Sequence, residues 1–564
     1  MKRWLRQTHG PLFELFRHFL GRFFDSDLIT ATEHTPTALV GTLSVVMQWM
    51  FLFIQPLKMK YEHFSRLPVP GPYREALRAD ELWLITLMMA AMGLLTAIKW
   101  QSLFPSLRDY RALASLPVRP GQLFLAKLLA LIAVSAAAIL ALNLLPGASF
   151  PAVTAGHWAF RPSLGVRAWA HFAACAAGGY FFFFALSALE GVLLNALRPA
   201  AFRRVAASLQ GVLAAAMLLL LVLSFSIQQQ VAHAAIEPRF ARFLPPAWFL
   251  GLYETLAGNP DAAMHRLARL GLTALAAAGL LTLAAYAVSY RRHRTLMVEG
   301  APARGSHRAW PARVLEWFMP NPREQAVVSF VGKTLSTSGQ HRMVLAGYCG
   351  FGLAVFVTAM LGIGKLYDPA KTVTASFVYA HLILLVSVLI GLRHLFSIPI
   401  ELGANWMFRT TEREGRRDWM RALDRLLLWG GAAGMLVMPL PLEIRLLGWR
   451  ALAEALLFAL AAMCCYEAAF SSWDKLPFTC SYLPGKTPAW IVALRLLGLL
   501  IALPLASSAL LACLYSPLAY GAALAILSLA WLRARALRRE TWGEAALRYE
   551  DLPDPAIHGL GLLQ

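Results

Sequence analysis

Few residues in this chain are spaced as a catalytic or phosphate-binding motif requires. A P-loop needs Gly, four residues and then Gly-Lys-Ser/Thr, placed after a strand. The tripeptide Gly-Lys-Thr occurs at 332–334 and at 485–487, but Val327 and Cys480 stand where the first glycine belongs. Neither tripeptide follows a soluble strand. We therefore expect the chain to lack an ATPase site and not to act as an enzyme by itself.

Metal-binding and hydrolytic motifs are also missing from the sequence. It contains neither His-Glu-x-x-His nor Gly-x-Ser-x-Gly, and its fourteen histidines are scattered. The six cysteines form no Cys-x-x-Cys or Cys/His set, so we expect no disulfide framework, metal site or cofactor. His171 and His381 lie in apolar segments, where we interpret them as packed or hydrogen-bonded structural residues. A catalytic centre assembled from residues far apart in the sequence stays open.

Two glutamates are candidates for a functional role because each lies within an apolar segment. Glu190 and Glu467 both fall near one end of the fourth such segment in their half of the chain. A carboxylate at that depth of a bilayer is costly unless it is paired or hydrated. Two interpretations stay open, a part in transport or a bond to a neighbouring helix or interfacial water. Lys127, one turn into the third segment, is expected to extend its ammonium group to the interface.

Long apolar stretches determine which solvent surrounds these residues. The chain is 58% hydrophobic and 15% charged, with a mean hydropathy of +0.55. A hydrocarbon core of about 30 Å requires roughly 20 apolar residues in a helix, and the runs are continuous rather than alternating as in a β-barrel. The sequence predicts an all-α polytopic membrane protein with about twelve spans. They are 36–57, 82–99, 123–145, 168–194, 211–227, 268–289, 343–364, 374–392, 426–443, 451–471, 489–514 and 517–532.

The net charge of +21 is distributed by side of the predicted membrane. With both termini in the cytoplasm, 35 Lys and Arg residues fall in inner segments and 15 in outer connections. An excess on one side sets the orientation of a membrane protein. We therefore expect a multi-pass protein of the bacterial inner membrane with both termini cytoplasmic, surrounded by lipid and with no nucleic-acid partner.

The predicted spans form two similar sets of six, in residues 1–300 and 301–564. Each half begins with an amphipathic segment of the kind that lies in a membrane interface, with Pro11 or Pro322 where a first helical turn accepts proline. After two spans, each half has a cytoplasmic loop in which Leu-Phe precedes an acid by six residues, at 103–109 and 395–401. We predict two pseudo-symmetric halves, each an interfacial helix followed by six spans.

The loops after the second and eighth predicted spans are candidate contact sites for a separate motor. Residues 103–116 and 401–425 combine an apolar face with several charges, which suits a short helix that another subunit could push. The alternative is an interfacial helix that only lies on lipid. The candidate coupling residues are Arg108, Asp109, Tyr110, Arg111, Glu401, Asn405, Trp406 and Arg409.

Three stretches carry a resemblance to a known family. Residues 103–110 read Leu-Phe-Pro-Ser-Leu-Arg-Asp-Tyr, 116–120 read Leu-Pro-Val-Arg-Pro, and 244–249 read Leu-Pro-Pro-Ala-Trp-Phe. The first two, followed by Phe-Leu-Ala-Lys at 124–127, resemble the region between spans two and three of type-2 ABC exporter permeases. The third is similar to the segment before their last span. The resemblance implies a permease whose segments 101–122 and 393–425 contact separate ATPase subunits, two copies being expected, and these would bind the ATP and Mg²⁺.

Several features leave other functions open. Most such permeases are six-span subunits that dimerise, whereas both halves are fused here, and residues 476–486 have no counterpart in the first half. The substrate and the direction of transport stay undetermined, although the apolar content favours a hydrophobic or amphipathic cargo. The alternative is a polytopic enzyme for lipid-linked substrates that uses Glu190, Glu467, Arg416 and Arg417. A transporter driven by an ion gradient would instead need deeper carboxylates.

Overall fold

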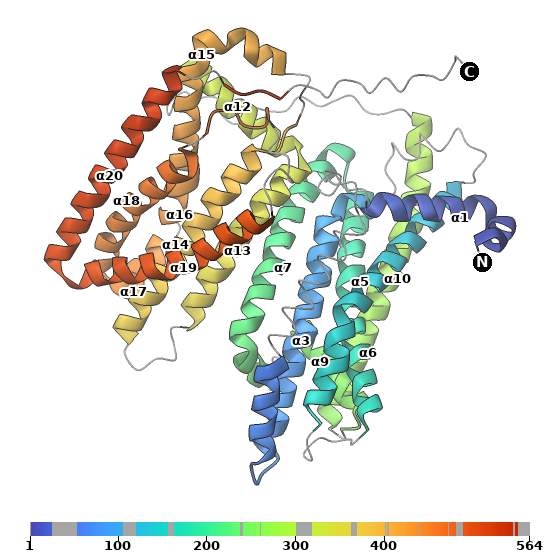
Figure 1. Ribbon diagram of the computed structural model, residues 1–564. Helices are drawn as coiled ribbons and strands as arrows, with labels where there is room; N and C mark the ends of the chain where they lie inside the picture. Colours follow the sequence, from blue (N-terminus) through green and yellow to red (C-terminus); the bar gives the residue numbers. More distant parts are fainter. Residues whose placement is uncertain are drawn as a thin grey trace. The chain divides into compact units, whose positions relative to one another are not determined.

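The chain consists of helices and connecting loops. The computed structural model describes residues 2–24, 54–104, 120–155, 163–236, 241–259, 261–299, 319–362, 369–400, 402, 405–437, 439–471, 473–480, 489–544 and 547–550. No strand occurs within these ranges (Figure 1). The chain divides into two compact units, Met1–Gly305 and Ser306–Gln564. We predicted the division after residue 300, five residues earlier.

Eight described helices are long and apolar enough to cross a membrane, which agrees with an all-α polytopic membrane protein. Two more predicted spans correspond to the shorter apolar stretches Ser208–Ser224 and Ala502–Tyr515 within longer helices. The predicted span 36–57 lies outside the described residues except for 54–57, so the total of twelve stays a prediction. The eight are Gly71–Ile98, Gly121–Val153, Leu164–Ala196, Ala262–Ser289, Gly339–Thr358, Val378–Phe396, Arg450–Phe470 and Pro517–Glu540.

The first unit is a bundle built around its second predicted span. Helix α3 packs against α6, α7 and α9, and α6 also packs against α10. Helix α1 lies across one end of the bundle and packs on α5 through the buried side chains of Leu15 and Phe19 (Figure 1). Their bounds are α1 (Lys2–Phe24), α3 (Gly71–Ile98), α5 (Pro120–Val153), α6 (Leu164–Ala196), α7 (Pro199–Ile236), α9 (Pro245–Leu256) and α10 (Ala262–Glu299).

The two prolines of the predicted interfacial helices lie at a kink inside α1 and at the start of α12. Gly10 in α1 has a φ of 26°, and the helix kinks there before Pro11. In the second unit α12 starts at Pro322, and the Asn321 side chain before it accepts a hydrogen bond from the Arg323 N–H. Proline fits these first turns because its missing N–H would have no partner within the helix.

The second unit repeats the packing of the first. Helix α14 packs against α18 and α19, and α18 packs against α20, as α3 packs against α6 and α7 and α6 against α10. The second predicted span of each unit thus contacts the fourth and fifth predicted spans, and the fourth contacts the last. The bounds are α12 (Pro322–Thr337), α13 (Gly339–Gly362), α14 (Pro369–Phe396), α15 (Asn405–Arg425), α18 (Arg450–Phe470), α19 (Ala489–Tyr515) and α20 (Pro517–Glu544).

The predicted span 426–443 is broken in the structure, so our prediction of a continuous apolar helix was wrong there. A π-helix, η4 (Leu426–Ala433), is followed by one turn, α16 (Gly434–Val437), and then by α17 (Leu440–Leu447). Pro439 caps α17 and Pro441 lies in its first turn. Proline donates no backbone hydrogen bond and ends a helix that precedes it, and hydropathy does not register this effect.

Substitution of Gly191 tests the close approach of α6 to α10. A Cβ there would lie 2.4 Å from the Ala285 Cβ and 2.7 Å from the Phe104 ring. We expect Gly191→Ala to destabilise the fold by about 1–3 kcal/mol through overpacking and to lower the Tm of the detergent-purified protein. Gly279→Ala is the control, because only Phe184, at 4.0 Å, is near. Equal Tm values for the two variants would contradict this packing.

Candidate functional site

Helix α15 is held against α12 by ion pairs at one end of the second unit. The Arg425 Nη1 lies 2.6 Å from the Glu324 Oε2 of α12, and the Arg421 Nη1 lies 3.7 Å from the other oxygen of Glu324. Arg421 also reaches Asp418, one turn earlier in α15, at 3.1 Å. The apolar face of α15 is buried at Trp419, where it belongs to the core of this unit. The helix therefore has a defined orientation.

Two short segments secure the first turn of α15. The Asn405 amide donates hydrogen bonds to the backbone carbonyls of Thr479, at 2.8 Å, and Glu550, at 2.9 Å. Phe478 forms two backbone hydrogen bonds with the residues that precede α15. Its N–H donates to the Phe396 carbonyl, and its carbonyl accepts from the Ile400 N–H. Asn405 is buried. It therefore joins segments 473–480 and 547–550 to α15, a structural role that its sequence position alone did not indicate.

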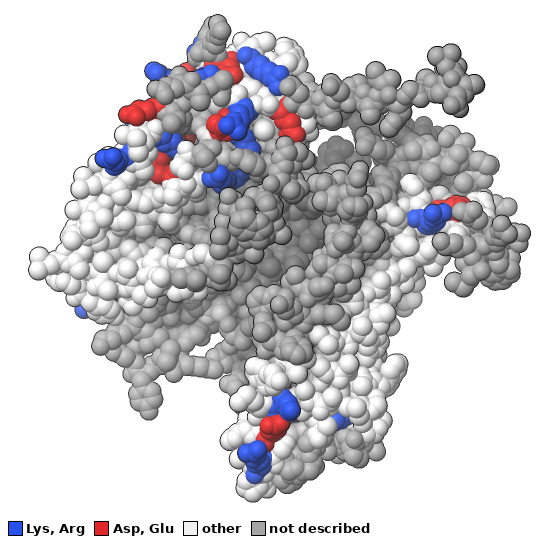
Figure 2. All heavy atoms as spheres, in the orientation of Figure 1, with Lys and Arg blue, Asp and Glu red and all other residues white. Residues whose placement is uncertain are grey.

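The side chains next to Asn405 differ in their exposure. Trp406 is 66% exposed and Met407 is 52% exposed, so two large apolar groups face outward at the start of α15. The Arg409 guanidinium lies 5.5 Å from the centre of the Tyr549 ring. Figure 2 shows basic and acidic side chains gathered over this end of the second unit. Among the described candidate coupling residues, Trp406 and Arg409 are exposed and Asn405 is buried.

Two groups in these segments titrate abnormally. Burial and the nearby Glu412 carboxylate raise the pKa of Tyr549, and burial lowers the pKa of Lys475. Because the unfolded chain holds the Lys475 proton more tightly than the folded protein does, this residue makes the protein more stable as pH rises between the folded and unfolded pKa values. Both groups are therefore more strongly desolvated than a flexible surface segment would allow.

The other candidate coupling residues, Arg108, Asp109, Tyr110, Arg111 and Glu401, lie outside the residues that the structure describes. The Leu-Phe pairs that precede the two acids are described. Leu103, Phe104, Leu395 and Phe396 are all buried in the cores of their units. The Leu-Phe pairs that the two halves share thus occupy buried packing positions in both units. Coupling by the acids stays a prediction.

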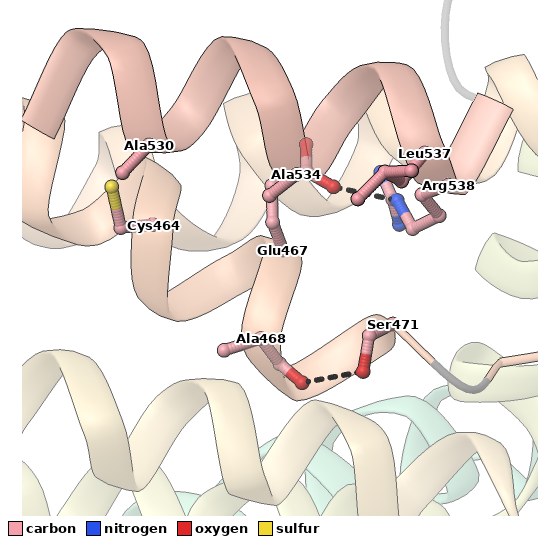
Figure 3. A pocket seen from close by; sticks show the side chains of 8 residues that line it. All are labelled: Cys464, Glu467, Ala468, Ser471, Ala530, Ala534, Leu537 and Arg538. Carbon is pink, nitrogen blue, oxygen red and sulfur yellow. Dashed lines mark hydrogen bonds and ion pairs between the residues drawn. The ribbon is translucent and has the colours of Figure 1, made fainter.

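Glu467 pairs with a basic residue of the last helix, as Figure 3 shows. The Arg538 Nε of α20 lies 2.7 Å from the Glu467 Oε2 of α18, and the Arg538 Nη2 lies 2.5 Å from the Asp424 Oδ1 of α15. The Tyr466 hydroxyl donates to Asp424 and accepts from Arg538 at 3.1 Å. Glu467 thus has an ion-pair partner on a neighbouring helix, although neither of its carboxylate oxygens forms a hydrogen bond among the described atoms; a part in transport stays a prediction.

A pocket opens beside this cluster between α18 and α20. Its volume is about 360 Å³, and its walls include Cys464, Ser471 and Leu537 together with Glu467 and Arg538 (Figure 3). One charged pair in a mostly apolar lining suits an amphipathic molecule better than a strongly charged one. The ion pair of Glu467 and Arg538 thus lies in the wall of a mostly apolar pocket in the second unit.

Glu190 occupies a comparable position in the first unit, with different neighbours. It is buried, and its Oε2 has no hydrogen-bond partner among the described atoms. Lys127 of α5 and Tyr286 of α10 interact with it electrostatically. The Lys127 ammonium lies 4.9 Å from the Phe19 ring of α1. Lys127 thus extends toward the interfacial helix, and Glu190, like Glu467, faces the last span of its unit.

A buried cluster that we did not predict lies near the other end of the first unit. The His171 Nδ1 of α6 is 2.9 and 3.0 Å from the carboxylate oxygens of Glu81 in α3. The Cys175 Sγ is 3.8 Å from the His171 Nε2. The interpretation of His171 as a hydrogen-bonded residue is therefore confirmed. Its spacing of four residues from Cys175 places both on one helix face and was the available signal.

The second unit has a related group that is less completely bonded. The His381 Nδ1 of α14 lies 3.0 Å from the Glu443 Oε1 of α17, but the orientation of the two groups is poor for a hydrogen bond. Glu454 of α18 is also buried, and its Oε1 has no hydrogen-bond partner among the described atoms. Both units thus bury a histidine and a glutamate between membrane-spanning helices.

No family model, curated protein or solved structure matches this chain. Assignment of a function therefore depends on the contacts within the chain itself.

Loss of the Arg538 guanidinium should destabilise the second unit. Arg538→Gln leaves Asp424 and Glu467 buried without their cation, which typically costs about 3–5 kcal/mol. We expect a lower Tm in a thermal unfolding assay of the purified protein, and partial recovery in the double variant Arg538→Gln/Glu467→Gln. The control is Arg539→Gln, because Arg539 is exposed. If the Arg538 and Arg539 variants unfold at the same temperature, these ion pairs do not stabilise the fold.

Proposed function

We propose that this chain is the membrane permease subunit of an exporter driven by separate ATP-binding-cassette ATPase subunits. The proposal rests on the resemblance of residues 103–127 to type-2 ABC exporter permeases and on the architecture of the second unit. In that unit an amphipathic, charged helix directly follows the second described span. A membrane protein that is moved by an external ATPase needs such an element outside the bilayer.

The observation that carries the proposal is the connection of α15 to the membrane helices. Its exposed start presents Trp406, while Asp424 in its last turn binds Arg538 of α20. Arg538 in turn binds Glu467 of α18. The backbone of α15 also continues into η4 without a break. A displacement at the start of α15 would therefore reach three membrane segments through bonded contacts rather than through a flexible loop.

In the proposed mechanism, ATP and Mg²⁺ are bound by two partner ATPase subunits and not by this chain. Association of the ATPases would press on α15 and on residues 101–122 of the first unit. Each unit would then change its conformation, and the cargo would shift the balance between states according to its difference in affinity for them. The pocket beside Glu467 and Arg538 favours a hydrophobic or amphipathic cargo.

This proposal places α15, and both chain termini, on the cytoplasmic side of a bacterial inner membrane, following the positive-inside distribution of Lys and Arg. The rival function, an enzyme for lipid-linked substrates, would use Glu190, Glu467, Arg416 and Arg417. In the structure Glu467 is bound to Arg538, and Arg416 is bound to Glu412 at 2.6 Å. Glu467 and Arg416 are thus engaged in ion pairs within the chain, and at these two residues the contacts support the transporter over the enzyme.

Co-purification tests the proposal directly. The full chain would be expressed with the products of its neighbouring reading frames and isolated from membranes in mild detergent. We expect a protein with a complete P-loop to co-purify and to hydrolyse ATP faster with the chain than alone. Charge reversal at Asp109 or Glu401 should abolish this stimulation while membrane insertion stays normal. Absence of any associated ATPase, or stimulation unaffected by both reversals, would count against the proposal.

Trp406 provides the sharpest single-residue test. Because Trp406 is 66% exposed, Trp406→Ala should change the free energy of unfolding by less than about 0.5 kcal/mol. If it is an interface anchor, the same change should weaken ATPase binding by about 2 kcal/mol or more, or roughly 30-fold in Kd.

The matched control is Trp449→Ala, in the turn between α17 and α18, where the side chain is 83% exposed. Affinity of the reconstituted complex would be measured by titration of the ATPase onto immobilised chain. Equal affinities for the Trp406 and Trp449 variants would remove Trp406 from the interface.

A further inference from the structure

The buried cluster of Glu81, His171 and Cys175 has the composition of a metal site. One donor atom from each residue lies within 4.8 Å of the others, and all three side chains are buried. Carboxylate, imidazole and thiolate are the ligands that Zn²⁺ takes in proteins. The three residues come from two helices, since Glu81 is in α3 and the other two are in α6.

The distances fit a zinc ion held by two atoms of α6. Zn–N and Zn–S bonds of about 2.0–2.1 and 2.3 Å around a tetrahedral ion place the two donor atoms about 3.6 Å apart. The separation of the His171 Nε2 and the Cys175 Sγ is 3.8 Å. Glu81 binds the opposite nitrogen of the same ring, as the carboxylates that orient metal-binding histidines do. No rearrangement of these three side chains is required.

A second observation near the ring also points to a ligand. Asn143 of α5 is buried, and its Nδ2 donates to the Phe172 carbonyl, but its Oδ1 has no hydrogen-bond partner among the described atoms. The Asn143 Oδ1 and the His171 Cδ2 are both 3.7 Å from the point where a Cβ on Gly147 would lie. A buried carbonyl oxygen without a partner is costly. A metal ion, or a water bound to it, would satisfy this oxygen.

The ion pair between Glu81 and His171 alone does not account for the cluster. The carboxylate satisfies the Nδ1 side of the ring, and the Cys175 sulfur, 3.8 Å from the Nε2, is only a weak hydrogen-bond partner for the other side. With Zn²⁺ present, one thiolate and one carboxylate balance the charge of the ion while the imidazole stays neutral. A neutral set is favoured in a medium of low dielectric constant, where an uncompensated charge is very costly.

We propose that Glu81, His171 and Cys175 form a site for one Zn²⁺ ion that fastens α3 to α6. His171 and Cys175 are the ligands, Glu81 orients the ring of His171, and the Asn143 Oδ1 or a water completes the coordination. The backbone near the site is itself fixed, because the Arg167 guanidinium donates to the carbonyls of Thr154 and Pro151. This site is independent of the proposed ATPase-driven function.

Metal analysis of the full chain tests the site. The protein would be purified into lipid nanodiscs without chelator, and its metal content measured by mass spectrometry, with about one zinc per chain expected. After removal of zinc, Co²⁺ should produce a thiolate-to-cobalt charge-transfer band, and Zn²⁺ at a hundredfold excess over its Kd should raise the Tm by about 2–4 °C.

Three variants assign the ligands. Cys175→Ser should remove the cobalt band and His171→Asn should remove stoichiometric zinc, while Glu81→Gln should weaken zinc binding about 10–100-fold. The matched controls are Cys349→Ser and His381→Asn in the second unit, which should bind zinc normally. A metal-free Tm equal to that of the metal-free parent would show that a variant folds.

Two results would overturn the site. The first is the absence of stoichiometric zinc in the folded parent protein, even after Zn²⁺ is added. The second is zinc binding that Cys175→Ser leaves unchanged. Copper in place of zinc would likewise overturn the assignment of the ion.

Discussion

Charges buried between membrane helices must be compensated by other helices, because hydrocarbon supplies no water to do so. The structure meets this constraint with pairs that join different segments. Glu254 of α9 binds Arg78 of α3 at 3.2 Å, Glu81 of α3 binds His171 of α6, and Glu467 of α18 binds Arg538 of α20. Such pairs add little net stability relative to apolar contacts. They do fix which helices are neighbours and at what height they meet.

The two units place their fourth-span glutamates against the same element and stabilise them differently. Glu467 meets an arginine of the last span, whereas Glu190 meets Tyr286 of the last span and Lys127 of the third. A guanidinium fixes its partner at two or three sites, but a lysine ammonium is a mobile point charge. The second unit is therefore the more rigidly bonded at this position. This difference is the asymmetry that a fused pair of halves permits and that a symmetric dimer does not.

Hydropathy predicted the helical class and most spans because apolar length is a local property of the sequence. It failed where a polar or backbone feature decided the outcome. We predicted that the second span begins at 82, yet α3 begins at Gly71 and buries both Asp80 and Glu81. Asp80 is compensated by Lys60, at 2.8 Å, and by the Tyr61 hydroxyl, at 2.7 Å. Such a partner is found only after the chain has folded.

For the candidate site, too, the sequence predicted the helix but not which of its side chains would be buried. The composition of 401–425 indicated an amphipathic charged helix, and α15 occupies 405–425. The sequence did not show that Asn405 would be buried while Trp406, beside it, would face outward. Adjacent residues of a helix point about 100° apart, so their burial depends on where the neighbouring segments pack. Segment 473–480 is what covers Asn405, and it overlaps residues 476–486, for which we found no counterpart in the first half.

That segment also explains how a surface helix can be rigid without being buried. Segments 473–480 and 547–550 hold its first turn, Glu324 of α12 holds its basic residues, and Arg538 holds its last turn through Asp424. Each contact anchors α15 to a different part of the second unit. Loss of any one of these contacts would therefore not release the helix. A displacement applied at its exposed end is then resisted at three points. The helix must move as a body and carry the charged cluster of α18 and α20 with it.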